Sequence, residues 1–141
     1  MTRLLFALFV SVCSQLVLAE TPVAIKDAWV REAPPSAHML AAYMTLQNTT
    51  GEEQVLVGVS SPHFSHVMLH KSEVVDGVAR MIHLDEIVIP GNSSVELAPG
   101  GLHLMMPAPE DQLTEGDSVE FVLTFSNGDP VTVEAEVRKK P

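Results

Sequence analysis

Apolar and polar residues alternate along much of the chain in short runs, which is the pattern of strands that bury one face. In residues 118–125, Val119, Phe121 and Leu123 fall at every second position, and residues 131–137 alternate in the same way. No stretch keeps a helical period. We therefore expect ten strands, at residues 23–30, 39–48, 54–60, 64–74, 79–84, 86–89, 94–98, 101–106, 118–126 and 131–138.

Turn signals separate most of these runs. Asp76-Gly77 indicates a two-residue hairpin loop, and Asn127-Gly128 marks another hairpin. Many short strands at this spacing predict an all-β fold, a Greek-key sandwich or barrel. A single helical turn is the one helical element that we consider, at residues 109–114.

The N-terminus has the features of a secretory signal peptide over residues 1–19. Arg3 is followed by an apolar run at 4–12, which is too short to span a bilayer, and small residues precede a cut at Ala19-Glu20. A membrane anchor is the less favoured alternative. We expect a periplasmic protein with one domain at residues 20–141 and no membrane insertion of the mature chain.

Charge and cysteine content exclude several classes of function. The formal net charge is −10, and cleavage would remove Arg3 but no acidic residue, leaving −11. Such a surface repels nucleic acid and anionic lipid. The single cysteine, Cys13, is preceded by Val12, where a lipoprotein signal has a small residue. A mature chain without cysteine has no disulfide and no thiolate ligand for a metal, and we expect it to be a monomer.

Two pairs of histidine and methionine residues form the candidate chemistry. His103 and Met105 are two apart on a predicted strand, so they share a face, while Leu104 points into the core. Gly100-Gly101 would let the backbone turn tightly into that strand.

The Asp76-Gly77 hairpin would bring the second pair together. In its register His70 faces His83, and Ser72 faces Met81, so His70 and Met81 are diagonal neighbours on one face about 7–8 Å apart. A slip of one residue would send one of them to the other face.

Two imidazoles and two thioethers form a soft, uncharged donor set, which suits Cu(I) far better than Zn(II), Mg(II) or Ca(II). A blue-copper centre is excluded because it requires a cysteine thiolate. The alternative for Met81 and Met105 is that they fill gaps in the core. Taken singly, His70 and His103 would more often be surface or hydrogen-bonded residues.

Other histidines are weaker candidates. His83 is a rival ligand because the hairpin register puts it opposite His70, and His38-Met39 is a candidate for a second, weak site. His66 lies four residues before His70, about 13 Å away if both are on a strand, which is too far for one ion to bridge. The sequence shows no catalytic set and no nucleophile motif.

The four principal candidates also have a distinctive spacing. Ten residues separate His70 from Met81, twenty-one separate Met81 from His103, and one separates His103 from Met105. This spacing resembles the H-x10-M-x21-H-x-M signature of the periplasmic copper chaperone family PCu(A)C. Residues 28–35, residues 41–44 with Asn48, and residues 101–105 also resemble that family, so the similarity spans nearly all of the mature chain.

The resemblance implies a cupredoxin-like β-sandwich or barrel that binds one Cu(I) through His70, Met81, His103 and Met105. It implies delivery of copper toward the centres of cytochrome c oxidase, with a Sco-type protein or the copper-centre subunit as acceptor. Residues 136–141 lack the His- and Met-rich tail of some members, so no tail site is expected. The alternatives are a copper-dependent redox enzyme and a metal-free β-sandwich binding module.

Overall fold

The computed structural model describes residues 21–139, so the predicted signal peptide, with Cys13, lies outside the described residues. All regular structure in this part is β-strand. The ten strands are β1 (Val23–Arg31), β2 (Met39–Asn48), β3 (Gln54–Ser60), β4 (Met68–Val75), β5 (Val78–Leu84), β6 (Ile87–Ile89), β7 (Ser94–Leu97), β8 (Leu102–Pro107), β9 (Ser118–Phe125) and β10 (Val131–Arg138).

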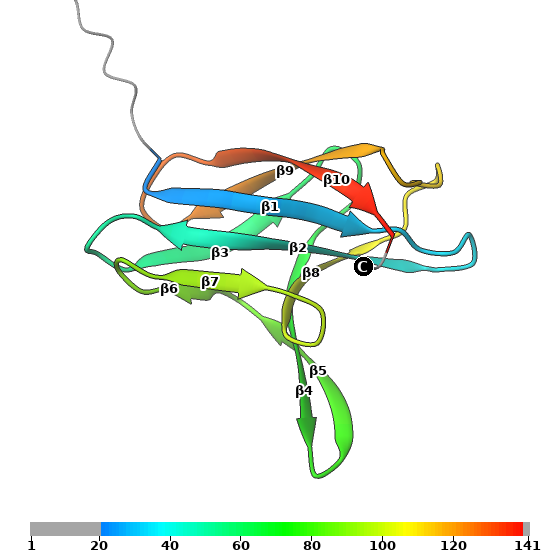
Figure 1. Cartoon of the computed structure of the whole chain (residues 1–141), viewed down its shortest axis with the longest axis horizontal. Helices are drawn as coiled ribbons and strands as arrows, with labels where there is room; N and C mark the ends of the chain where they lie inside the picture. The colour runs from blue at the N-terminus through cyan, green and yellow to red at the C-terminus, as the bar shows by residue number, and fades with distance from the viewer. Residues whose placement is uncertain (1–20, 140–141) are drawn as a thin grey trace, which may run out of the picture.

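The strands form one continuous sheet in the order β5-β4-β8-β2-β1-β10-β9-β3-β6, and it folds over a common core (Figure 1). Strand β2 pairs with β8 through its first half and with β7 through its second half. The first and last strands, β1 and β10, pair in parallel, whereas every other pairing is antiparallel. The predicted all-β class, a cupredoxin-like β fold, is confirmed.

The core consists of the inward positions of the alternating runs. Val30, Leu46, Leu104 and Phe121 are among its fully buried side chains. Each such side chain stabilises the fold by about 1.5–3 kcal/mol through removal of apolar surface from water. The inward face of β8 is therefore fixed by packing, and this also fixes the direction of its outward residues.

All ten expected strands are present, with one clear shift at the start of β4. The run predicted at 64–74 begins as a strand only at Met68, and the residues before it form turns and bends. Phe64 is nevertheless buried and stacks on Phe121 with ring centroids 6.1 Å apart. Phe64, at the start of the predicted run, is thus a loop side chain that inserts into the core.

The helical turn considered at 109–114 is wrong, because the described residues contain no helix there. The carboxylate of Asp117 accepts hydrogen bonds from the Thr114 backbone N–H at 2.7 Å and from its hydroxyl at 3.2 Å. Pro109 has no N–H to donate. These features favour an irregular segment that ends in a turn.

The β4–β5 hairpin projects from the body of the molecule, as Figure 1 shows. Strand β5 is one edge of the sheet, and all of its residues except Leu84 are exposed. Within residues 21–139 no helix is long and apolar enough to cross a membrane.

Candidate metal centre

The four predicted ligands lie on three adjacent strands, β5, β4 and β8. His70 on β4 pairs directly with His103 on β8, and Ser72 on β4 pairs with Met81 on β5. The hairpin register predicted from Asp76-Gly77 is therefore confirmed. Since paired residues share a face of the sheet, both imidazoles and Met81 lie on the same side.

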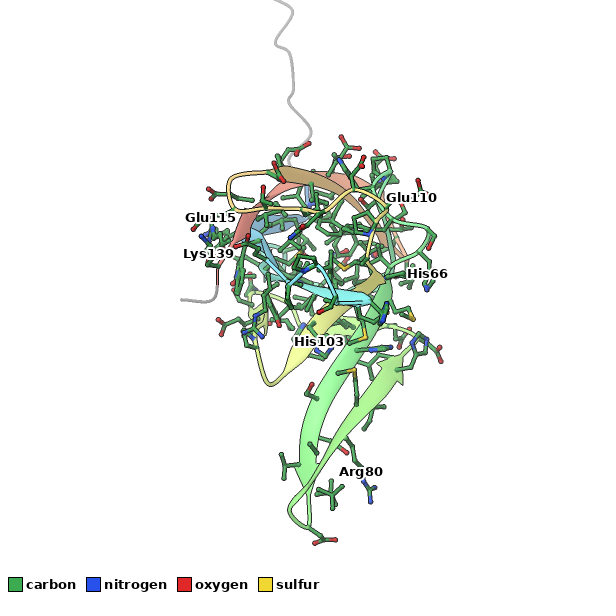
Figure 2. The ribbon with its side chains drawn as sticks, turned by 90° about the vertical axis from the view of Figure 1, so that its right-hand side faces the viewer. His66, Arg80, His103, Glu110, Glu115 and Lys139 are labelled. Atoms are coloured by element: carbon green, nitrogen blue, oxygen red, sulfur yellow. The ribbon has the colours of Figure 1, made fainter. Side chains whose placement is uncertain are left out.

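Met105 joins this outer face because it is two residues from His103 on β8. Leu104 between them is fully buried on the other face, as expected. Gly100 has a φ of +86°, and Gly101 donates a backbone hydrogen bond to Ala98 at 3.0 Å, so a tight turn leads into β8. Figure 2 shows His103 near the base of the projecting hairpin.

The two imidazoles are close neighbours. The ring centroids of His70 and His103 are 5.8 Å apart, and the rings are nearly perpendicular at 86°. His103 is only 5% exposed, whereas His70 is half-buried. Two nitrogen donors are thus held on adjacent strands of a packed sheet, where neither backbone is free to move away.

The hydrogen bond of His103 shows which of its nitrogens is available. Its Nδ1 lies 3.0 Å from the backbone carbonyl of Gly101, which can only accept, so Nδ1 carries the hydrogen. The lone pair of Nε2 is then free. Histidine ligands of metals commonly donate their second ring N–H to a carbonyl in this way, which fixes ring orientation.

His70 is prepared for a ligand in a different way. Its Nδ1 is buried and has no hydrogen-bond partner in the described part of the chain. Burial lowers the pKa of His70 below its ordinary value of 6.5, and the neighbouring charges of protonated His103 and His83 lower it further. A neutral imidazole with an unpartnered buried nitrogen is suited to bind a metal ion, because the nitrogen lone pair, which water cannot reach, would coordinate the ion.

The thioethers differ in their exposure. Met81 lies on the edge strand β5 and is 53% exposed, while Met105 on β8 is half-buried. Neither is a core residue, so the gap-filling alternative does not describe them. Within residues 21–139, no three His, Cys, Asp or Glu side chains are arranged to hold a metal ion.

His83, the rival ligand, does lie opposite His70, with ring centroids 5.5 Å apart. It is largely exposed, and its Nε2 is 3.8 Å from the carboxylate of Asp85. Its place on the same face leaves it available as a further donor. His66, by contrast, precedes β4 in an irregular stretch, so the premise that it shares a strand with His70 is wrong.

The His38-Met39 pair is split by the start of β2. Met39 lies on the outer face, because Ala41 two residues later pairs with Met105. The carbonyl of His38 accepts a hydrogen bond from the Ala108 backbone N–H at 2.9 Å. The structure thus places Met39 of this pair on the same face as the main candidate centre.

Sequence reasoning missed Met68. It pairs directly with Met105, so it is a third methionine beside the two imidazoles. The signal that could have found it is its spacing. Met68 precedes His70 by two residues, as the mirror image of His103 and Met105.

Comparison with known proteins assigns the chain to a family. Residues 23–137 match the family described as "Putative lipoprotein LpqE-like". The chain belongs to the LpqE-like family. This LpqE-like chain is also 31% identical over 127 residues to the protein named "Putative lipoprotein Lxx21020" from Leifsonia xyli subsp. xyli, covering 85% of this chain and 75% of that protein.

Solved structures similar to this one include PCuAC domains. The copper-bound PCuAC domain from PmoF2 has a TM-score of 0.71 and 26% identity, over 85% of this LpqE-like chain and 95% of that domain. The Cu(I) form of DR1885 from Deinococcus radiodurans has a TM-score of 0.68 and 30% identity, over 90% and 85% respectively. The family relationship predicted from the His and Met spacing is confirmed.

Proposed function

We propose that this LpqE-like protein is an extracytoplasmic copper carrier, which binds one Cu(I) through His70, Met81, His103 and Met105. The single observation that carries the proposal is the pairing of His70 with His103, two imidazoles with a free nitrogen each, on a face that also carries methionines. The copper-bound state of the similar PCuAC domain from PmoF2 supports it.

The donor set explains the choice of metal. Thioether sulfur is soft and uncharged, and neutral imidazole also suits Cu(I), whereas Zn(II) and Mg(II) are bound poorly by such sulfur. Cu(I) has no geometric preference that would demand a strained cage. Three adjacent strands of one sheet can therefore supply all four donors from side chains alone.

The exposure gradient across the site supports release by ligand exchange. His103 is buried and held by Gly101, so it anchors the ion, whereas Met81 lies at the exposed edge of the sheet. An acceptor can reach Met81 first and replace one bond at a time. Copper is the cargo in this mechanism, and no substrate is transformed.

The partner that we propose is a copper acceptor of the oxidase assembly route, such as a Sco-type protein or the copper-centre subunit of cytochrome c oxidase. The net charge of −10 favours an acceptor with a basic docking surface. The family description as a lipoprotein supports a location outside the cytoplasm.

The test is a Cu(I) titration under reducing conditions against a chromophoric chelator. We expect one tight equivalent in the parent protein, a strong loss of affinity in His103→Ala and a smaller loss in Met81→Leu. Met106→Leu is the matched control, because Met106 is on the same strand as Met105 but is fully buried on the other face. Tight binding that is indifferent to His103→Ala and Met81→Leu would refute the proposed site.

A further inference from the structure

The methionines of this protein are divided between the core and one outer face. Six of the seven lie in the part of the chain that the structure describes. Met44 and Met106 are buried in the core. The remaining four share the face of the two imidazoles through the strand registers: Met39, Met68, Met81 and Met105.

Met68 has the same relation to one imidazole that Met81 has to the other. Met81 faces Ser72 and is therefore diagonal to His70. Met68 faces Met105 and is therefore diagonal to His103. Diagonal neighbours of this kind lie about 7–8 Å apart at the backbone, within reach of long side chains. The imidazole pair thus has one thioether on β5 at one side, and Met68 and Met105 at the other.

The two diagonal methionines differ in their exposure. Met81 is 53% exposed on an edge strand that projects from the body. Met68 is half-buried at the start of β4, which is paired on both sides by β5 and β8. Met68 also borders a surface hollow together with His83 and Asp85, so it is not sealed by packing. Figure 2 shows Arg80, the neighbour of Met81 on β5, toward the hairpin tip and His103 near its base.

We propose that Met68 is a third thioether ligand of the copper site, which takes the place of Met81 when Met81 leaves the ion. This inference rests on the proposed function. The exchange breaks one copper–sulfur bond and forms another, so the ion stays Cu(I) and no proton is transferred. The ion keeps four donors throughout, and its open side turns toward the acceptor at the edge of the sheet.

This role makes a distinctive prediction for a double-mutant cycle of Cu(I) dissociation constants with Met68→Leu and Met81→Leu. Leucine preserves volume, so both variants are expected to fold. Met68→Leu alone should weaken binding by less than about threefold, because the four primary donors remain. In the Met81→Leu background the same change should weaken binding by roughly tenfold or more, the coupling expected of groups that substitute for each other.

X-ray absorption provides the direct measurement. The Cu(I) form of Met81→Leu should retain two sulfur neighbours, and the double variant should retain one. Met106→Leu, in the core, should leave the affinity and the sulfur count unchanged in either background. Thermal melts of each apo variant verify that the fold is intact.

The outcomes separate this inference from the function on which it rests. If the parent protein binds no Cu(I) tightly, both are overturned. If it binds one equivalent but Met68→Leu has the same small effect in both backgrounds, or Met81→Leu shows a single sulfur neighbour, only the role of Met68 is overturned.

Discussion

Leu104 and Met105 are neighbours on strand β8, but their substitutions should have opposite effects on stability and on copper binding. Leu104 is fully buried in the core, whereas Met105 faces outward beside the imidazoles. Leu104→Ala removes three buried carbon atoms, worth about 2.4 kcal/mol of transfer free energy at roughly 0.8 kcal/mol each. The cavity left behind adds to this, so the free energy of unfolding should fall by about 3–4 kcal/mol. Met105→Leu preserves volume at a half-buried position and should cost less than about 1 kcal/mol.

The assay is urea unfolding of the apo protein, followed by the fluorescence of the single tryptophan, Trp29, which is buried against Tyr43. The midpoint of Leu104→Ala should shift down by about 2 M urea, given typical slopes for a domain of this size. Leu102→Ala is the matched control, because Leu102 is on the same strand and face but only half-buried, and its shift should be clearly smaller.

Copper binding should show the reverse pattern. Met105→Leu should lower Cu(I) affinity by on the order of tenfold or more, the effect that even the outer partners of metal ligands have. Folded Leu104→Ala should bind Cu(I) as the parent does, and saturating copper should restore part of its lost stability by mass action. A loss of stability in Met105→Leu as large as that in Leu104→Ala would refute the assignment of the two faces of β8.

Three further predictions concern residues with distinct environments. The pKa of His70 is lowered in the fold, so the unfolded chain binds more protons than the folded chain. The free energy of unfolding of the apo protein should therefore be highest above pH 6.5 and should fall as the pH drops from there through the lower folded pKa. His70→Gln should flatten this part of a pH series of urea midpoints. Asn48→Ala should lower the urea midpoint without changing Cu(I) affinity. The buried amide of Asn48 donates to three backbone carbonyls and accepts from the backbone N–H of Thr50 at 2.9 Å. Each backbone group that the substitution leaves unpaired costs about 1–3 kcal/mol. Gly91→Ala would place its Cβ 2.4 Å from the Gly51 carbonyl oxygen, so its melting temperature should fall well below that of Gly58→Ala, where nothing lies within 4 Å of the new Cβ.

The strands are predictable from the sequence because their alternation is strong and their turns are explicit. The Asp76-Gly77 loop specifies the β4–β5 register correctly, and that register by itself makes Met81 diagonal to His70. The pairing of β4 with β8 cannot be derived in the same way. These strands are separated by β5, β6 and β7 in the chain, and only packing of the whole sheet brings them together.

The features that the sequence analysis misplaced or missed all depend on tertiary packing. The predicted strand began too early, at residue 64, because the burial of Phe64 against Phe121 is a tertiary contact that alternation cannot distinguish from a strand position. Met68 escaped notice because methionine is usually a core residue, and its outward direction follows from the β4–β8 register. The free nitrogens of the two histidines depend on burial and on the Gly101 carbonyl, which no spacing reveals.

The parallel pairing of β1 with β10 has a consequence for the order in which the sheet forms during synthesis of the chain. Trp29 on the first strand pairs with Glu136 on the last. A ribosome adds about 5–20 residues per second, and the first strand cannot find this partner until the final strand has been released. Contacts between such distant segments also form slowly. The topology therefore delays the completion of the sheet until β10 has been synthesised, although local pairs such as β4–β5 can form earlier.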